Sequence, residues 1–218
     1  MSSISVSFKS LDELRLEGEL DLPEEAVAAV VLCHPHPKMG GTMTAPLLLA
    51  LRDELLSRRW AVLRFNFRGI GRSEGESSTG ELETEDAAGA LDLVRERRPD
   101  LPVAIAGWSF GGAVAVRVAA LDEAVTACVA IAPAVRAQPR ITNGLPAPES
   151  VGTGRPLLVV CGANDRVVEP ADCRSWAGAV ETACYVEISG ANHFFWARYP
   201  KLCRTVGDFL EGAHHPQR

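Results

Sequence analysis

Short apolar segments alternate with amphipathic ones along most of this chain. Six stretches are almost wholly apolar and rich in valine: residues 27–33, 61–65, 103–107, 125–131, 157–161 and 184–188. Strands that are covered on both faces of a parallel sheet have this composition, because neither face meets water. Between them, apolar residues recur at helical spacing in residues 45–58, 82–97, 110–121, 171–180 and 199–211. This alternation of strands and helices predicts an α/β fold with a mostly parallel, doubly wound sheet.

The first twenty residues follow a different pattern, in which apolar and polar positions alternate. Residues 5–8 alternate in this way, and in residues 14–20 three leucines and a glycine share one face while Arg15, Glu17 and Glu19 share the other. Alternation with period two is typical of half-buried strands. The sheet is therefore expected to begin with two antiparallel strands.

The length of 218 residues fits one domain with one large core. We expect that domain to span residues 1–212, followed by a disordered polar tail at 213–218. Residues 133–155 show no clear element and are rich in proline and glycine. Loops of this length are usually functional or mobile, so this segment is expected to rim the site or to cover part of it, although it is too short for a large cap domain.

Charge and cysteine usage restrict the partners and the compartment. The chain has 22 basic and 28 acidic residues and a formal net charge of −6, so a nucleic-acid-binding surface is not expected. No basic segment with an apolar core opens the chain, and no stretch reaches about 18 uncharged apolar residues, so neither secretion nor membrane spanning is expected. Six cysteines without C-x-x-C spacing favour a reduced, cytoplasmic compartment without disulfides or zinc.

The run from Gly107 to Gly112, Gly-Trp-Ser-Phe-Gly-Gly, carries the most specific chemical signal. It follows an expected strand and precedes an expected helix, which is the context of a G-x-S-x-G nucleophile elbow. Small residues at the glycine positions permit the sharp turn that exposes a serine hydroxyl above the sheet. Ser109 is therefore the candidate nucleophile.

A serine nucleophile needs a base and an acid that orients the base. Among the five histidines, two precede Ser109 and two lie in the polar tail, so His193, which follows a strand, is the candidate base. Of the carboxylates between these two residues, Asp165 comes just after the carboxyl end of a buried strand, where α/β sheets place functional groups. The order Ser, Asp, His along the chain is the α/β-hydrolase order.

An oxyanion hole would complete such a site, at about 3 to 4 kcal/mol per donor. The N–H after the nucleophile belongs to Phe110, and a second N–H should come from the loop after the third strand, residues 33–43. Pro35 and Pro37 have no N–H, so His36 is the nearest donor and Lys38 the second choice.

Other side chains near the motifs allow weaker predictions. His34 and His36 form an H-x-H pair, but no further ligands gather with them in the sequence, so no metal is expected. Trp108 and Phe194 are next to the candidate nucleophile and base, and we expect them to contribute to a substrate pocket.

Four segments together resemble the compact, cap-poor α/β-hydrolases that are related to dienelactone hydrolases and small bacterial esterases. They are the His-Pro-His-Pro loop at 34–43, the Arg-Phe-Asn-Phe-Arg-Gly-Ile-Gly-Arg-Ser segment at 64–73, the elbow at 107–112 and the Asp165…His193 pair. The resemblance covers nearly the whole chain and implies a structural role for Arg68. The chain departs from the family's pattern in three places: His-Pro replaces the frequent His-Gly, Asn66 stands where Asp is more common, and dienelactone hydrolases use Cys in place of Ser109.

These observations predict a serine hydrolase that cleaves small-molecule carboxylic esters without cofactor or metal. Cleavage of thioesters or small amides by the same residues stays open, because the acyl chemistry is shared. A non-catalytic binding module on the same scaffold also stays open, since a fold alone does not establish an activity.

Overall fold

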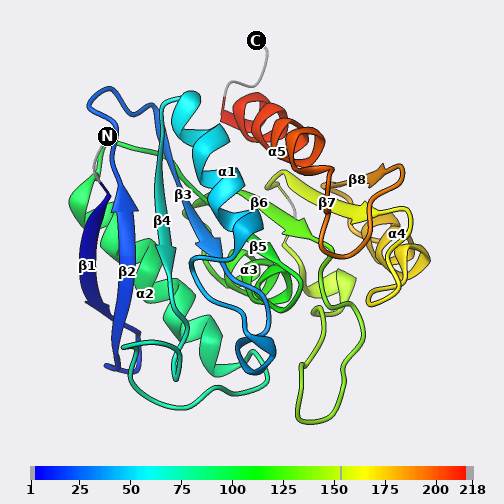
Figure 1. The fold of residues 1–218 in the computed structure, drawn as a ribbon, viewed down its shortest axis with the longest axis horizontal. Helices are drawn as coiled ribbons and strands as arrows, with labels where there is room; N and C mark the ends of the chain where they lie inside the picture. Colours follow the sequence, from blue (N-terminus) through cyan, green and yellow to red (C-terminus); the bar gives the residue numbers. More distant parts are fainter. Residues whose placement is uncertain (1–2, 153, 215–218) are drawn as a thin grey trace.

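One mixed sheet forms the centre of the computed structural model, which describes residues 3–152 and 154–214 (Figure 1). The strands of this described part follow the order β1-β2-β4-β3-β5-β6-β7-β8. Their bounds are β1 Ile4–Lys9, β2 Arg15–Asp21, β3 Ala28–Cys33, β4 Trp60–Phe65, β5 Val103–Trp108, β6 Val125–Ile131, β7 Leu157–Gly162 and β8 Ala183–Ile188.

The antiparallel start that the alternating pattern predicts is confirmed. β1 pairs antiparallel with β2, and β2 pairs antiparallel with β4. Leu16, Gly18 and Leu20 point toward the core and are buried, whereas Arg15 is exposed. All other strand pairs are parallel. Every residue of β3, β4, β5 and β7 is buried, and apart from Arg64 in β4 these strands hold only apolar residues and glycine, as expected of a sheet covered on both faces.

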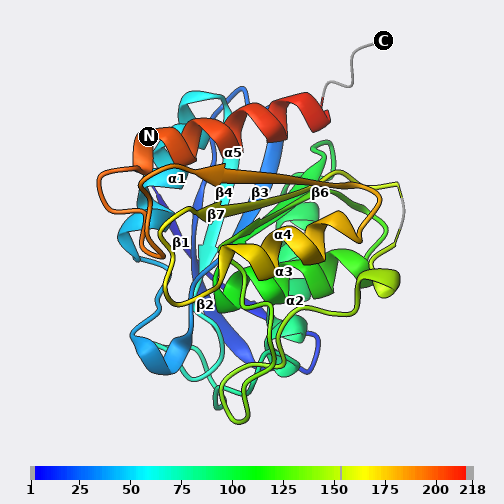
Figure 2. The same cartoon turned by 90° about the vertical axis from the view of Figure 1, so that its right-hand side faces the viewer.

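Helices cover the two faces of the sheet in separate layers (Figure 2). α1 (Pro46–Ser57) and α5 (Tyr199–His214) pack on one face. α2 (Leu82–Arg97), α3 (Phe110–Leu121) and α4 (Pro170–Gly178) pack on the other. Leu51 of α1 and Leu202 of α5 are buried on the first side, and Leu91 of α2 and Val114 of α3 on the second. This three-layer arrangement leaves the ends of the strands as the accessible part of the sheet.

The expected elements agree with the observed ones to within a few residues, with one difference at the carboxyl end. α5 continues to His214, so Ala213 and His214 belong to a helix and not to the tail in which they were expected. Residues 215–218, the rest of the expected tail, lie outside the described residues.

The segment from 133 to 155 carries little regular structure where the structure describes it. It has a bridge between Gln138 and Thr142 and a single 3-10 turn at Pro148–Ser150. Within the residues that the structure describes, no helical layer of this segment covers the carboxyl ends of the strands, which agrees with the predicted lid-less fold.

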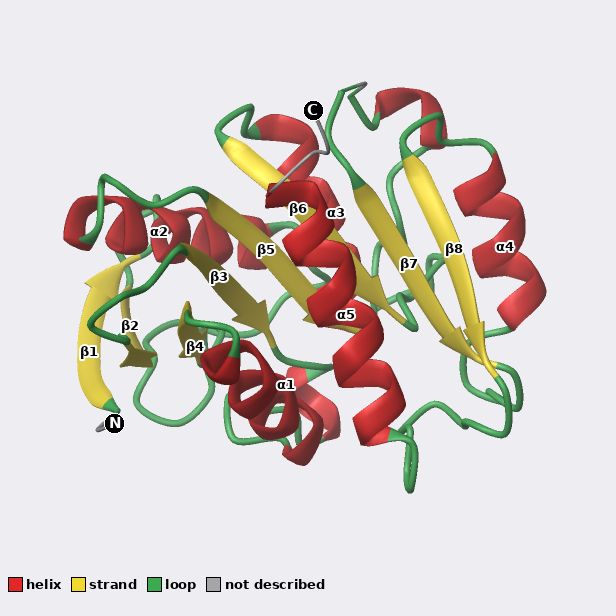
Figure 3. Cartoon of the chain, turned by 90° about the horizontal axis from the view of Figure 1, so that it is seen from above, coloured by secondary structure: helices red, strands yellow, loops and turns green. Residues whose placement is uncertain are grey.

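The carboxyl ends of the parallel strands meet along one edge of the sheet (Figure 3). Ser109 directly follows β5, Asp165 follows β7 and His193 follows β8. The strand order reverses between β3 and β5, because β4 lies on the far side of β3. Open α/β sheets bind ligands in the crevice at such a reversal.

Candidate active site

Ser109 lies on a sharp turn between β5 and α3. Its φ and ψ are 56° and −114°, a left-handed region that costs a non-glycine residue about 1 to 3 kcal/mol. Hydrogen bonds hold the turn: the Ser109 N–H donates to the Ile131 carbonyl (2.8 Å), and the Ser109 carbonyl accepts from the N–H groups of Ala113 (3.1 Å) and Ala134 (3.2 Å). The surrounding chain thus maintains a strained conformation that leaves the side chain only half buried.

The glycines on either side of Ser109 are required by close backbone approach. A Cβ at Gly107 would lie 2.1 Å from the carbonyl oxygen of Gly111, and a Cβ at Gly111 would lie 2.4 Å from the carbonyl oxygens of both Cys33 and His34. No side chain fits at such distances. The elbow therefore packs directly against the end of β3, where the candidate oxyanion loop begins.

His193 connects the hydroxyl of Ser109 with the carboxylate of Asp165. His193 Nδ1 lies 2.8 Å from Asp165 Oδ2, and His193 Nε2 lies 3.1 Å from Ser109 Oγ. A carboxylate can only accept a hydrogen bond, so the proton of the neutral imidazole is on Nδ1, and Nε2 is free to accept from Ser109. The structure therefore brings together the three residues that the sequence singled out.

Both oxygens of Asp165 have partners. Oδ1 accepts hydrogen bonds from the N–H groups of Val167 (2.8 Å) and Val168 (2.9 Å), which leaves Oδ2 for His193. Asp165 and His193 are 5% and 6% exposed. Low exposure strengthens the hydrogen bond between them, because little water competes for either group.

The candidate oxyanion donors are two backbone N–H groups, those of Phe110 and His36. The Phe110 N–H is the first of α3, and the first N–H groups of a helix have no partner within the helix. Among the described residues, the His36 N–H also donates no hydrogen bond. The Lys38 N–H is different, because it donates to His36 Nδ1 (3.1 Å). Lys38 is therefore not available as the second donor, and His36 stays the candidate.

The His36 imidazole links the oxyanion loop to the 133–155 segment. Its Nδ1 accepts from Lys38, so its Nε2 carries the proton and donates to the Ile141 carbonyl at 3.0 Å. The ring also lies 5.0 Å from the Phe110 ring, centroid to centroid. This bridge was not predicted, because nothing in the sequence relates two positions that are 105 residues apart.

A pocket of about 120 Å³ opens beside Ser109. Its walls come from the oxyanion loop, the elbow, the 133–155 segment and the residues after Asp165: His36, Met39, Ser109, Phe110, Ala134, Val135, Arg136, Gln138, Ile141, Thr142, Val167, Val168, Glu169 and Asp172. The expectation that residues 133–155 rim the site agrees with this lining. The individual wall residues were not predicted, because a loop without periodicity gives no signal for which side chains point inward.

Trp108 and Phe194, the pocket residues suggested by the sequence, do not line this pocket. The ring of Trp108 lies 5.9 Å from the His193 imidazole, and its Nε1 donates to the His193 carbonyl at 3.1 Å. The ring of Phe194 lies 5.6 Å from the imidazole. Both side chains therefore pack on the candidate base.

His34 braces the oxyanion loop from within the core. The ring is fully buried; its Nδ1 donates to the Pro35 carbonyl (2.6 Å), and its Nε2 accepts from the Phe67 N–H (3.1 Å). Burial lowers the pKa of His34 to about 4, so this ring is neutral at pH 7.

Asn66 connects the same loop to the antiparallel strands. Its Oδ1 accepts from the Met43 N–H, and its Nδ2 donates to Glu17 Oε1, both at 2.8 Å. An Asp at this position would oppose the Glu17 carboxylate with a like charge. The neighbouring glutamate therefore explains the asparagine.

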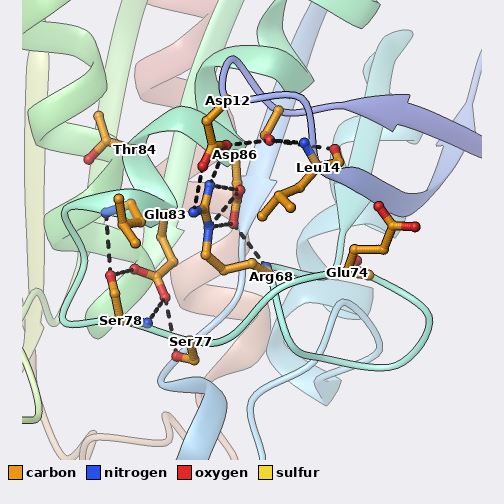
Figure 4. A network of polar contacts seen from close by, with 12 residues as sticks. Asp12, Leu14, Arg68, Glu74, Ser77, Ser78, Glu83, Thr84 and Asp86 are labelled. Atoms are coloured by element: carbon orange, nitrogen blue, oxygen red, sulfur yellow. Dashed lines mark hydrogen bonds and ion pairs between the residues drawn. The ribbon is translucent and has the colours of Figure 1, made fainter.

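Arg68 has the structural role that the resemblance implied (Figure 4). Its guanidinium donates to Asp86 (Nη2 to Oδ1, 2.7 Å) and to Asp12 (Nη2 to Oδ1, 2.8 Å), and its side chain is only 2% exposed. Burial works against the charged guanidinium, but the hydrogen bonds that it donates to the two carboxylates, together with their negative charges, outweigh this effect and raise the pKa of Arg68. Nearby, buried Glu83 accepts hydrogen bonds from Ser77 and Ser78.

Two further observations concern ligands and membranes. Among the residues with a described position, no three His, Cys, Asp or Glu side chains gather as metal ligands would. In the same residues, no helix has the length and apolar character needed to cross a membrane.

The strand order, the lid-less edge and the elbow define an α/β-hydrolase fold, and comparison with known proteins agrees. Residues 24–153 match the family described as "Serine aminopeptidase, S33", and the chain belongs to this family of serine hydrolases. It is 28% identical to a putative α/β hydrolase of Agrobacterium tumefaciens, with a TM-score of 0.85 and 98% of each chain covered.

Two more relatives are informative. An α/β serine hydrolase without lid from Xanthomonas campestris is 27% identical, with a TM-score of 0.82 and coverage of 97% of this chain and 94% of that one. A thiohydrolase of Aspergillus aculeatus is 29% identical over 138 residues, which cover 61% of this chain and 42% of that protein. The resemblance to compact α/β-hydrolases is thus confirmed.

Proposed function

We propose that this protein is a serine esterase in which Ser109 is the nucleophile, His193 the general base and acid, and Asp165 the residue that orients His193. The observation that carries the proposal is the continuous line of hydrogen bonds from Asp165 through His193 to Ser109 Oγ, at 2.8 and 3.1 Å. Ser109 stands at the same time on a strained elbow beside a pocket. A serine in a glycine-rich surface turn needs none of these features.

The first half-reaction forms an acyl-enzyme. Ser109 Oγ attacks the ester carbonyl carbon while His193 Nε2 takes the hydroxyl proton. The carbonyl oxygen becomes an oxyanion, which the N–H groups of Phe110 and His36 stabilise. The bond to the leaving alcohol then breaks, and His193 returns its proton to the departing oxygen.

The second half-reaction restores the enzyme. Water attacks the acyl carbon and gives a proton to His193 Nε2, and the acid leaves as Ser109 Oγ takes that proton back. Asp165 stays ionised throughout and stabilises the imidazolium that forms in each half.

The pocket beside Ser109 and Phe110 is suited to the acyl group. Val135, Ile141 and Val168 give it apolar walls. Its volume of about 120 Å³ is similar to cavities of roughly 150 Å³ that hold one benzene molecule. We therefore expect short acyl groups to be preferred.

Thioester hydrolysis is the second candidate, and the similarity to a thiohydrolase favours it. Both reactions pass through the same acyl-enzyme, and they differ only in the leaving group. The two candidates therefore call for one experiment with matched substrates.

The test compares p-nitrophenyl butyrate with butyrylthiocholine on the wild type, on Ser109→Ala and on Ser175→Ala. Ser175 is an exposed serine of α4 and provides a matched control. We expect hydrolysis of the ester by the wild type and by Ser175→Ala, and a loss of about 10³-fold or more in kcat/KM for Ser109→Ala. A higher kcat/KM for the thioester would favour the second candidate. A folded wild type that hydrolyses neither compound would favour the binding module.

A further inference from the structure

Two large aromatic side chains are exposed next to His193. Phe194 is 39% exposed and Trp196 is 64% exposed. Their rings are stacked, with centroids 4.9 Å apart and planes 15° from parallel. The Phe194 ring also meets the His193 imidazole edge-on at 5.6 Å. The two stacked rings, the 194/196 stack, thus present exposed apolar surface beside the imidazole, with Phe194 in contact with both His193 and Trp196.

The backbone of this loop is built to expose these rings. Phe195, which lies between them, is completely buried. Phe195 and Ala197 both have positive φ, at 52° and 59°, a conformation that costs a non-glycine residue about 1 to 2 kcal/mol. The Phe194 N–H is fixed by a hydrogen bond to Asn192 Oδ1 at 3.1 Å. The chain therefore bears backbone strain in an arrangement that exposes both neighbours of Phe195.

The chemistry of the proposed reaction relates this surface to one part of the substrate. His193 Nε2 must return its proton to the departing oxygen, so that oxygen lies within hydrogen-bonding distance of the imidazole. The group bonded to that oxygen then extends from the imidazole. Trp108 also contacts the ring but is only 7% exposed. Phe194 therefore provides an accessible apolar surface in contact with His193, and the stack extends this surface to Trp196.

The acyl group has a different place to bind. The pocket beside Ser109 and Phe110 is lined by other residues, and neither Phe194 nor Trp196 contributes to it. An ester whose carbonyl carbon is at Ser109 can thus place its acyl part in that pocket and its alcohol part over the stack.

We infer that the 194/196 stack binds the leaving group and makes the enzyme selective for esters of aryl-bearing alcohols. This inference rests on the proposed function. Stacked aromatic pairs gain interaction energy beyond the area they bury, and covering exposed Trp196 also removes apolar surface from water. Selectivity for the alcohol is then set by Trp196, while selectivity for the acyl group is set by the pocket.

The test uses three esters with the wild type, Trp196→Ala and Trp196→Phe. 2-Naphthylmethyl acetate and ethyl acetate share an acyl group but differ in the alcohol, and ethyl benzoate carries an aryl group of the size of the pocket on the acyl side. We expect Trp196→Ala to lower kcat/KM for 2-naphthylmethyl acetate about 3- to 10-fold, mainly through KM, with ethyl acetate and ethyl benzoate unchanged. Trp196→Phe should restore most of the loss. Leu121→Ala, which removes another exposed apolar side chain at the end of α3, should change none of the three.

Other results overturn the inference. An equal loss for all three esters would show that Trp196 acts only on the shape of the site, and no loss for any of them would show that the stack does not bind substrate. Labelling of each variant with a fluorophosphonate separates these results from failure of the proposed function. A wild type that is not labelled would overturn the proposed function and this inference with it.

Discussion

Asp165 shows how a single side chain can fix the geometry of the whole candidate site. One of its oxygens accepts from His193, and the other accepts from the N–H groups of Val167 and Val168. The carboxylate therefore cannot rotate without losing a hydrogen bond, and it holds the imidazole with Nε2 toward Ser109.

This arrangement predicts a large effect of Asp165→Asn. The amide can turn its NH₂ group toward Nδ1 and select the wrong tautomer, so Nε2 would carry the proton and could not act as the base. We expect kcat to fall by about 10³- to 10⁴-fold, with an unchanged thermal unfolding curve by circular dichroism. A loss of less than tenfold would show that Asp165 does not orient the base.

His34 leads to a prediction about stability and pH. Its pKa is about 4 in the folded protein and about 6.5 in an unfolded chain, so the unfolded state binds more protons between these two values. The contribution of His34 to the free energy of unfolding is therefore complete above pH 6.5. It falls by about 3 kcal/mol in total as the pH drops toward and below 4.

The measurement is urea unfolding at pH 7 and pH 4.5 for the wild type and His34→Gln. Glutamine can still accept from the Phe67 N–H but does not titrate. The wild type should lose more free energy of unfolding than the variant between the two values of pH. Equal losses would rule out His34 as the group responsible.

At the scale of single residues, the sequence identifies a catalytic candidate where few residues of the required type occur in the required place. Only one histidine followed a strand after Ser109, and only one carboxylate in between directly followed a buried strand, so elimination led to His193 and Asp165. Elimination did not identify the second oxyanion donor. The Lys38 N–H is already bonded to the His36 side chain, and only the folded loop reveals this hydrogen bond.

At the scale of elements, the contact between the elbow and β3 determines where the nucleophile lies. Gly111→Ala would place a Cβ 2.4 Å from the carbonyl oxygens of Cys33, the last residue of β3, and of His34, which follows it. We expect loss of stable folding or a drop of several kcal/mol in the free energy of unfolding, because backbone atoms would have to move.

Gly178→Ala is the matched control within a helix. No atom lies within 4 Å of a Cβ at this position of α4, so the substitution should be neutral or stabilise by up to about 1 kcal/mol. Urea unfolding of both variants measures the difference. Similar stabilities of the two would contradict the close packing of the elbow.

The sequence predicted the elements well, because buried strands and amphipathic helices each repeat one pattern over several residues. Residues 133–155 lack such a pattern, and their inward-facing side chains, such as Val135 and Ile141, were found only in the structure. Trp108 and Phe194 do not line the pocket beside Ser109 but contact His193, which the sequence does not reveal. Proximity of Trp108 and Phe194 to Ser109 and His193 in the sequence does not determine which way their rings point.

At the scale of the whole molecule, buried Arg68 joins three parts that are distant in the sequence. It follows β4, and it pairs with Asp12 in the turn between β1 and β2 and with Asp86 of α2 (Figure 4). The antiparallel edge of the sheet and one helical layer are therefore connected through a single cation.

This network predicts that removal of its two carboxylates lowers the free energy of unfolding by different amounts. Asp86 is fully buried, so Asp86→Ala removes the main partner of the buried Arg68 charge and should lower the free energy of unfolding by about 3 to 5 kcal/mol. The Asp12 side chain is 41% exposed, and because water screens this pair, Asp12→Ala should cost about 1 kcal/mol or less. Thermal and urea unfolding give both values. Equal losses of unfolding free energy in the two variants would contradict the claim that Asp86 is the main partner of Arg68.

The central claim, that Ser109 is an activated nucleophile, is tested most directly by intact mass after exposure to a fluorophosphonate. The wild type and the control Ser175→Ala should each gain the mass of one adduct, whereas Ser109→Ala should gain none. An adduct on Ser109→Ala, or no adduct on the folded wild type, would contradict the claim.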